Sequence, residues 1–272
     1  SSIFSYPDNW DVWPALILFF VFTWLENVYS GAARPFSLGL LILLYSVITW
    51  GGMAVFGKQR WISHGEAFSV LFGFFARFSP TEVRVIDNEI CRTCKIQCEG
   101  EVGECIDCYS CFDLAGKTGR RRELNLRPYA VGLTNVGKVS TPTALFVLLA
   151  LATVTFDGLK ETPTWVGFQT LAYPVASIFG PVTIDIIDTL GLIIVPVTFV
   201  LVYLVFAWAI RQLSGTNEEV PEVARTFVFS LIPIALAYNV AHFVSLITIQ
   251  GQLIIPLASD PFGYGWDLFG TA

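Results

Sequence analysis

The sequence predicts an all-α polytopic membrane protein with about five transmembrane helices, two interfacial or re-entrant helices and a small Cys-rich cytoplasmic loop. Three observations predict this class. Of the 272 residues, 54% are hydrophobic and only 14% are charged, and the mean hydropathy is +0.63, whereas a soluble domain has about a quarter charged residues. Apolar stretches of membrane length recur along the chain, and all six cysteines lie in one polar loop.

Five apolar stretches are predicted to cross the membrane. A hydrocarbon core about 30 Å thick needs roughly 20 apolar residues in a helix. The predicted spans are residues 13–29, 35–56, 143–156, 184–213 and 226–250. Pro196 and Pro233 lie inside the last two spans and are expected to kink them, because proline frees backbone groups that neighbouring helices must then satisfy.

Two further apolar stretches, residues 67–78 and 165–182, are too short or too broken to cross. Both are expected to be interfacial or re-entrant helices, which lie against protein or water rather than lipid. Ser63 followed by Glu66 is typical of a capping box that opens the first of these helices. His64, between them, is expected to be exposed.

The positive charges predict how the chain is oriented. Threading the spans in alternation puts fourteen of the sixteen Lys and Arg residues on one side of the membrane, with Arg34 and Lys160 on the other. Cytoplasmic loops carry an excess of Lys and Arg, so the richer side is the cytoplasm. We therefore expect a multi-pass protein of the cytoplasmic (inner) membrane. Its regions are a membrane part over residues 1–79, a cytoplasmic Cys-rich loop over 80–141 and a second membrane part over 142–272.

The cysteine loop predicts a metal site. Its two halves have similar spacing, C-x2-C-x3-C and C-x2-C-x2-C: Cys91, Cys94, Cys98, Cys105, Cys108 and Cys111. Two facing C-x2-C turns bring four thiolates onto one ion, and zinc binds four at about 2.3 Å. We expect Zn2+ on Cys91, Cys94, Cys105 and Cys108, with Cys98 or Cys111 able to replace one of them. An iron–sulfur cluster on four thiolates is the alternative.

Three disulfides or free thiols are the other interpretations of the six cysteines, and a reducing cytoplasm disfavours the disulfides. Zinc held by four thiolates has no open coordination position, so it would fold a loop too small to build a core rather than catalyse a reaction. The basic run at residues 117–122 (KTGRRR) is expected to contact anionic lipid head groups. The acidic pI near 4.9 argues against a nucleic-acid partner.

Ionisable residues inside a span are candidates for function, because they are costly there unless paired or hydrated. Glu26 and Asp157 lie near the outer ends of two predicted spans, and His242 lies about two thirds of the way along the last one. If they converge, they could bind a divalent metal and activate water, or relay protons. Asp185 and Asp188, at i and i+3, are expected at a helix end in head-group water, where carboxylates favour the helix N-terminus.

Eight short strings of the sequence carry a resemblance to a known family. They are residues 24–29 (WLENVY), 65–68 (GEAF), 75–80 (FARFSP), 156–158 (FDG), 162–165 (TPTW), 230–252 (SLIPIALAYNVAHFVSLITIQGQ), 259–263 (SDPFG) and 267–271 (DLFGT). Together they resemble the bacterial and archaeal membrane proteins known as fenitrothion hydrolases. The resemblance covers most of the chain except the cysteine loop. It implies a membrane-bound activity that splits the aryl ester of an organophosphate. The strings contain Glu26, Glu66, Asp157, His242, Asp260 and Asp267.

Two functions follow as hypotheses. The first is a metal-assisted hydrolase of phosphoester-like substrates, in which Glu26, Asp157 and His242 hold a divalent metal at an outer-leaflet site and Asp260 assists. No G-x-S-x-G or H-E-x-x-H motif is present. The second is a non-enzymatic membrane subunit or transporter, with the cysteine loop as a metal-stabilised docking module. The expected partners are the lipid bilayer and either other membrane subunits or further copies of the chain.

Overall fold

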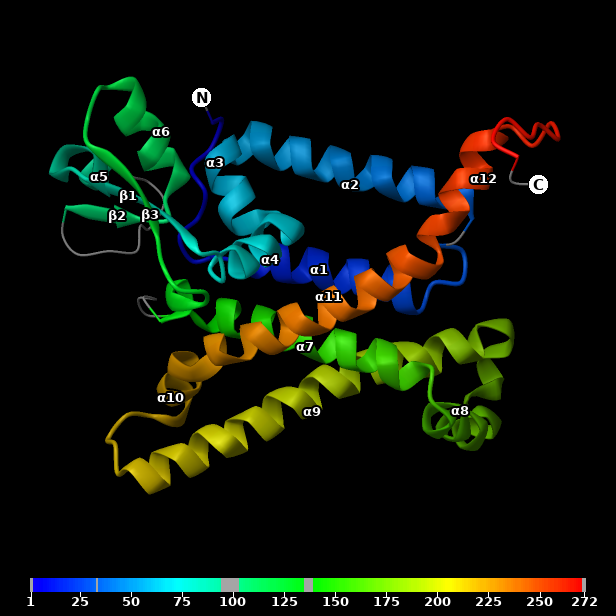
Figure 1. The fold of residues 1–272 in the computed structure, drawn as a ribbon. Helices are drawn as coiled ribbons and strands as arrows, with labels where there is room; N and C mark the ends of the chain where they lie inside the picture. The colour runs from blue at the N-terminus through cyan, green and yellow to red at the C-terminus, as the bar shows by residue number, and fades with distance from the viewer. Residues whose placement is uncertain (1, 33, 94–102, 135–138, 271–272) are drawn as a thin grey trace. The chain divides into compact units, whose positions relative to one another are not determined.

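The computed structural model describes residues 2–32, 34–93, 103–134 and 139–270. The chain divides into two units, Ser1–Ile232 and Pro233–Ala272, and each is described by itself. Figure 1 shows that helices make up most of the first unit and that a small sheet lies at one end of it. The predicted all-α class is confirmed for the apolar parts of the chain.

The long helices of the first unit coincide with predicted apolar stretches. They are α1 (Trp13–Asn27), α2 (Pro35–Phe56), α7 (Thr141–Lys160), α8 (Pro163–Ala176) and α9 (Thr183–Ser214). The eight-residue α10 (Val220–Phe227) was not predicted and overlaps the span predicted over residues 226–250 only at its last two residues. α7 is longer than predicted at its start, because the Ser140 hydroxyl caps it by accepting from the N–H of Thr143 at 3.3 Å.

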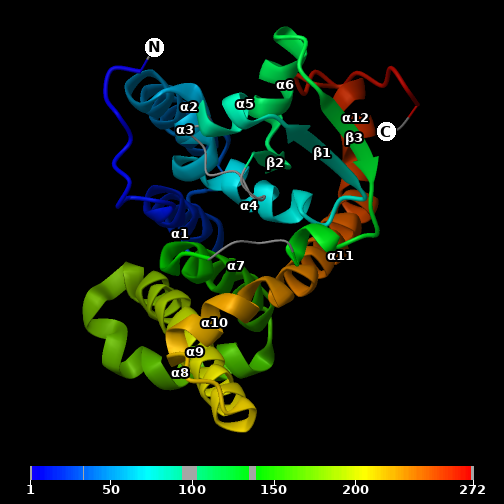
Figure 2. The same cartoon turned by 90° about the vertical axis from the view of Figure 1, so that its left-hand side faces the viewer.

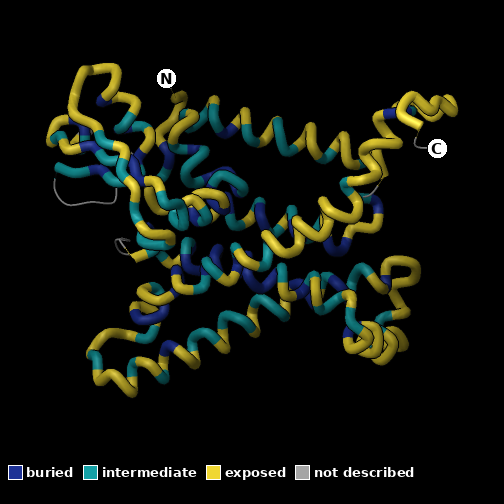
Figure 3. The backbone as a smooth tube through the Cα atoms, in the orientation of Figure 1, coloured by how far each residue is buried: buried dark blue, intermediate teal, exposed yellow. Residues whose placement is uncertain are grey.

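By length and composition, four helical stretches of the described chain could cross a membrane: Pro35–Phe56, Thr141–Lys160, Pro163–Ser214 and Val220–Ser259. α1 has 15 residues, or about 22 Å at 1.5 Å per residue, so the fifth span stays a prediction. Figure 3 shows α2 exposed along most of its length. Gly52 is its one buried residue, which suits a helix surrounded by lipid.

The chain reverses direction after α2. Gly57 has a φ of 87°, which glycine adopts at low cost. The short α3 (Lys58–Arg60) and the π-helical turn η1 (Trp61–Gly65) then pack back along α2. The Trp61 ring lies between two glycines. A Cβ atom added to Gly52 would come within 2.1 Å of the ring, and one added to Gly65 would come within 2.5 Å. These two glycines set how closely the returning chain packs on α2.

α4 (Ala67–Ala76) begins where the chain turns again. The Phe68 ring contacts Phe22 of α1 at 4.8 Å and Tyr45 of α2 at 5.7 Å between centroids. Tyr45 is the eleventh of the 22 residues of α2, so the turning point is level with the middle of that helix. We call residues 57–79 the re-entrant segment because the chain runs back along α2 and then reverses; its entry into the membrane stays a prediction. The apolar stretch predicted at residues 67–78 is present within it.

The main core of the first unit holds the re-entrant segment in place. It joins α1, α4, α7 and the 3-10 turn η4 (Val228–Leu231). Phe146 of α7 lies fully buried in this core. Its ring contacts Phe19 of α1 at 5.1 Å and Phe74 of α4 at 5.6 Å. The outward-running half of the segment is therefore packed against two neighbouring helices.

The second broken stretch, predicted over residues 165–182, forms α8 and the 3-10 turn η3 (Ser177–Val182). Gly180 bends the chain there with a φ of 66°, and α8 packs against α9. Trp165 lies against Gly191 of α9, where a Cβ atom would come within 2.3 Å of the ring. A larger residue at position 191 would push α8 away from α9.

The second unit consists of α11 (Ile232–Ile249), the 3-10 turn η5 (Gly251–Leu253) and α12 (Ile254–Ser259). The span predicted over residues 226–250 is interrupted, because η4 separates α10 from α11. Pro233 is the second residue of α11, and proline fits the first turn of a helix, where its missing N–H is not needed. The expected kink therefore lies before α11 rather than inside it.

The cysteine loop folds as a small α+β module. Strands β1 (Thr81–Ile86), β2 (Glu104–Ile106) and β3 (Arg122–Leu126) form an antiparallel sheet in the order β2–β1–β3. The helices α5 (Asn88–Thr93) and α6 (Tyr109–Lys117) lie on one side of the sheet (Figure 2). The expectation of a loop without its own core was wrong, because Val83 and Val85 of β1 are buried at 4% and 1% exposure.

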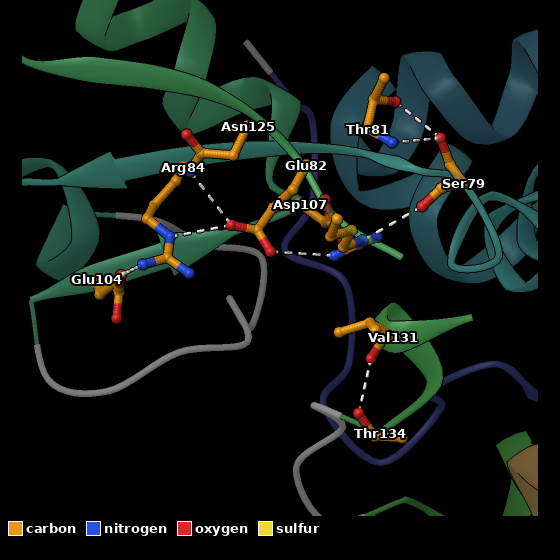
Figure 4. Close-up of polar contacts among 10 residues, drawn as sticks. Ser79, Thr81, Glu82, Arg84, Glu104, Asp107, Asn125, Val131 and Thr134 are labelled. Carbon is orange, nitrogen blue, oxygen red and sulfur yellow. Dashed lines mark hydrogen bonds and ion pairs between the residues drawn. The ribbon is translucent and has the colours of Figure 1, made fainter. Parts of the chain in front are cut away.

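A buried arginine ties this module together. The Arg127 and Glu82 side chains are 6% and 7% exposed, and Nη1 lies 3.4 Å from Glu82 Oε2. Arg127 Nη2 lies 2.8 Å from Asp107 Oδ2 and forms an ion pair with it, but the two atoms do not have hydrogen-bond geometry. Arg127 Nε donates to the Ser79 carbonyl at 3.2 Å. Glu82 also pairs with Arg84 at 3.0 Å, as Figure 4 shows. Arg127 thus joins the sheet to the end of the re-entrant segment.

Replacing Arg127 by Met is expected to destabilise the module by about 2 kcal/mol or more, because Asp107 loses its ion-pair partner and the buried Glu82 keeps only the partly exposed Arg84. Amide hydrogen exchange in β1 and β3 of the purified full chain measures this. Arg121→Met is the control, since Arg121 is 75% exposed and pairs with Glu123, and such pairs contribute less than about 1 kcal/mol. Equal losses of protection in the two variants would contradict the role of Arg127.

Candidate functional site

The predicted acid–histidine set is divided between the two units. Glu26 is exposed on α1 and Asp157 is partly exposed on α7, both in the first unit. His242 is exposed on α11 of the second unit, where its ring stacks on Tyr238 at 6.2 Å and meets Phe243 edge-on at 5.4 Å. The convergence of the three side chains therefore stays a prediction.

Asp260 closes a turn in the second unit. Its carboxylate accepts the N–H groups of Tyr264 at 2.8 Å and Gly265 at 2.6 Å. Desolvation raises the pKa of Asp260, but these backbone hydrogen bonds outweigh it and hold the pKa below its ordinary value. Asp260 therefore has a local structural role, whatever else it does.

Within the described part of either unit, no three His, Cys, Asp or Glu side chains are grouped so that they could hold one metal ion. The divalent metal of the hydrolase hypothesis has no such group to support it there.

Four cysteines pack into one buried cluster in the module. Cys105, Cys108 and Cys111 are 1%, 8% and 3% exposed, and Cys91 packs against them beside Val85, Ile90 and Ala115. The Cys91 thiol also approaches the Val85 carbonyl at 3.8 Å. Cys94 and Cys98, the remaining predicted ligands, lie outside the described residues. The four described cysteines share a core, but no three of them are grouped so that they could hold one ion, and the zinc site stays a prediction.

The basic run beside this cluster is engaged within the module. Arg120 pairs with Asp87 at 3.2 Å and Glu89 at 2.5 Å. Lys117 pairs with Asp113 at 2.6 Å, Arg121 pairs with Glu123 at 2.7 Å, and the Arg122 guanidinium lies 4.7 Å from the Phe112 ring centre. These partners compete with the expected lipid head groups, and the sequence did not indicate them.

The module also touches both ends of the re-entrant segment. The Ser110 hydroxyl of α6 donates to the Gln59 side chain of α3, near the start of the segment. Arg127 holds the Ser79 carbonyl at the other end. The position of the segment therefore depends on the fold of the cysteine module.

Glu66, at the turning point of the re-entrant segment, is a buried carboxylate that was expected to complete a capping box begun by Ser63. It is 6% exposed and is itself the N-cap of α4, accepting the N–H groups of Phe68 at 3.1 Å and Ser69 at 2.6 Å. The Tyr45 hydroxyl donates to the same carboxylate. Ser63 instead donates back to the Gln59 carbonyl at 2.9 Å. The expected capping box was therefore wrong in its cap residue.

The side of α2 that faces the re-entrant segment is polar. Tyr45, Thr49 and Gly52 lie at i, i+4 and i+7 and so share one face. Trp61 Nε1 on the facing η1 is buried and has no hydrogen-bond partner among the described residues. Buried polar atoms are normally paired, so this orphaned atom indicates ordered water or a ligand between α2 and the segment.

His64 lies near the start of the segment. Its ring is 5.7 Å from that of Tyr6 and its Nδ1 is 2.7 Å from the Ser63 hydroxyl. It is half-buried rather than exposed as expected.

Asp188 is a second buried carboxylate in the helical part of the first unit. It is 4% exposed, and its Oδ1 accepts from Trp165 Nε1 at 2.9 Å and Gln169 Nε2 at 2.7 Å. The expectation that it lies at a helix end in head-group water was wrong. The packing of α8 over the first turns of α9 buries it, and nothing in the local sequence indicates that contact.

No family model, curated protein or solved structure matches this chain. The resemblance to fenitrothion hydrolases stays a prediction.

Acid is expected to loosen the cysteine module through Asp87, the cap of α5. Its Oδ1 accepts from Ile90 N at 3.0 Å and Glu89 N at 2.9 Å. These hydrogen bonds hold the pKa of Asp87 below its ordinary value, and the bond from Ile90 has the largest effect. The resulting stabilisation is present above the unfolded-state pKa, about 4, and is lost as pH falls through the lower folded-state pKa. Hydrogen-exchange protection of the Ile90 and Cys91 amides should fall over that range.

Asp87→Asn keeps a capping oxygen without the charge, so it should flatten this pH step once intrinsic exchange rates are removed. Asp113→Asn, on the exposed Lys117 pair of α6, is the matched control and should keep the step. An undiminished step in Asp87→Asn would contradict the assignment.

Proposed function

We propose that this protein is a membrane transport protein for a small monovalent cation, with Glu66 as the residue that binds the cation during passage. One observation carries the proposal: a buried carboxylate lies at the turning point of a re-entrant segment, level with the middle of α2. Irregular backbone at membrane depth is tolerated where it is packed in protein or lines water, and transporters build their ion sites there.

The partners of Glu66 hold a negative charge without cancelling it. They are two backbone N–H groups and a tyrosine hydroxyl, and no ion pair joins Glu66 to a Lys, Arg or His among the residues described. The N-terminus of α4 adds a partial positive charge of about half a unit. A net negative charge therefore remains to attract a cation, as expected of an ionisable residue on a transport pathway.

An orphaned polar atom supports a hydrated route to this carboxylate. Trp61 Nε1 lies on the interface between η1 and α2, between the Tyr45–Glu66 contact and the end of α2. Water that satisfies it would connect Glu66 to the side where the re-entrant segment begins. The charge pattern of the sequence predicts that this side is the cytoplasm.

This proposal favours the transporter over the hydrolase. The hydrolase needs Glu26, Asp157 and His242 to gather on a metal, and it rests on the resemblance and on the similar depth of these residues in the predicted spans. The transporter rests on the burial and contacts of Glu66. We further propose that the cysteine module docks a partner subunit and is stabilised by zinc, supported by the two C-x2-C spacings of its sequence, Cys91–Cys94 and Cys105–Cys108.

Glu66→Gln is expected to reduce cation uptake by proteoliposomes containing the full chain by at least about tenfold, equivalent to ~1.4 kcal/mol. Glutamine keeps an acceptor for the first turn of α4 but removes the charge. Uptake is measured under an imposed inside-negative potential, with an internal pH dye in one arm and a sodium dye in the other. The arm that responds identifies the cation.

Glu161→Gln, the same chemical change at an exposed position beyond α7, is the control and should transport as the wild type does. Wild-type vesicles that take up neither ion, or Glu66→Gln vesicles that match the wild type, would reject the proposal.

The zinc proposal predicts stoichiometric zinc in protein purified without added metal and under anaerobic conditions. Zinc removal by a chelator should then expose amides of α5 and α6 to hydrogen exchange, because metal-site binding energy is folding energy. Metal-free protein with intact disulfides would argue for the alternative interpretation of the six cysteines.

A further inference from the structure

We propose that residues 259–270 form a folded aromatic turn that anchors the far end of the second unit in the head-group region of the bilayer. The turn follows α12 directly. Three of its rings are exposed: Phe262 at 70%, Tyr264 at 71% and Trp266 at 46%. A lipid–water interface fits this surface, because it accepts the apolar body of a ring and leaves a polar edge hydrated.

Two side chains hold the turn in one conformation. The Asp260 carboxylate accepts the N–H groups of Tyr264 at 2.8 Å and Gly265 at 2.6 Å. The Ser259 hydroxyl is 2% exposed and accepts the N–H of Phe269 at 3.1 Å. These three backbone donors are satisfied inside the turn. The turn therefore suits a region where bulk water is scarce and unpaired backbone groups are costly.

The three exposed rings form one cluster. The centroid distances are 5.9 Å between Phe262 and Tyr264, 6.2 Å between Phe262 and Trp266, and 5.5 Å between Tyr264 and Trp266. Together the rings present a continuous apolar surface that also contains a phenol hydroxyl and an indole N–H. Tyr and Trp are enriched at membrane interfaces because they combine these two properties.

The length of the preceding helices puts the turn at head-group level. Arg225 of α10 contacts Thr141, where the candidate span α7 begins, so the chain starts α11 near that end of α7. From Ile232 to Ser259 the chain is helical for most of its length (Figure 1) and extends about 42 Å at 1.5 Å per residue. A bilayer is about 40–45 Å thick with its head groups, so a chain that starts at one surface reaches the other at Ser259.

The surface that leads to the turn is apolar as well, and it carries little charge. The last turns of α11 and α12 expose Ile247, Ile249, Ile254 and Leu257, as expected of helices that face lipid. In residues 251–270 the sequence has two charged side chains, Asp260 and Asp267, and no Lys or Arg. The turn therefore has no cation to pair with lipid phosphates, and its contact with lipid is independent of lipid charge.

An anchor of this kind fixes how deeply the second unit lies in the membrane. It requires no transport through Glu66, so a failure of either proposal leaves the other standing.

The test is a fluorine NMR spectrum of the full chain, labelled with fluorotryptophan, in phosphatidylcholine nanodiscs. Trp266→Phe assigns the Trp266 resonance by its loss. A nitroxide near the lipid head group should broaden this resonance more than a nitroxide at the end of the acyl chain or a water-soluble paramagnetic chelate. Trp165, which is 7% exposed and is assigned by Trp165→Phe, is the interior control and should respond weakly to all three.

Three results would overturn the anchor. Broadening by the chelate alone means that the ring lies in water, and broadening by none of the three means that protein covers it. Strongest broadening by the acyl-chain nitroxide means that the ring lies in the hydrocarbon core. Adding anionic phosphatidylglycerol should leave the order of the three effects unchanged, and a reversal of that order would contradict a contact independent of lipid charge.

A second variant tests whether the fold of the turn matters. Asp260→Ala removes the acceptor for Tyr264 and Gly265, so the Trp266 resonance should become less sensitive to the head-group nitroxide and more sensitive to the chelate. Asp260→Asn keeps one acceptor oxygen and should change less. The other tryptophan resonances report whether the rest of the chain stays folded. Unchanged broadening of Trp266 in Asp260→Ala would reject a folded turn as the anchor.

Discussion

The hydrogen bonds between the Glu66 carboxylate and the first turn of α4 are the interaction on which the re-entrant segment depends. The first N–H groups of any helix lack partners within it, and α4 begins inside the protein, where bulk water does not supply them. Glu66 provides two acceptors at 3.1 and 2.6 Å, and each hydrogen bond to a charged group is worth about 1.5–3 kcal/mol. Tyr45 ties the same carboxylate to α2, so one side chain fixes the helix start and its depth beside α2.

The segment is also held from outside by the cysteine module. Ser110 contacts Gln59 near the start of the segment, and Arg127 contacts the Ser79 carbonyl at its end. Ser110 lies between Cys108 and Cys111, whose packing builds the small core of the module. The fold of this module therefore bears directly on the position of Glu66. This link gives the module a structural reason to be inserted between the two apolar halves of the chain.

The sequence predicted features that depend on local composition, and it missed those that depend on contacts between distant segments. Apolar length was enough to locate α2, α7 and α9, and interruptions were enough to mark the segments around α4 and α8. Residues 80–141 appeared to form a loop too small to build a core, yet three short strands assemble one around Val85. The burial of Asp188 arises because Trp165, 23 residues earlier, packs against Gly191. The role of Glu66 required knowing that the chain turns back along α2.

The most direct test of this account is the sidedness of the chain on either side of the re-entrant segment. An azide-bearing phenylalanine analogue can be placed at Phe4, Phe36 or Tyr129, which are 64%, 85% and 69% exposed, and labelled in sealed vesicles with a membrane-impermeant alkyne. If residues 57–79 enter and return, Phe4 and Tyr129 react from one side and Phe36 reacts from the other. Labelling of Tyr129 from the side opposite to Phe4 would mean that the segment crosses the membrane, and it would contradict the placement of Glu66 at a turning point.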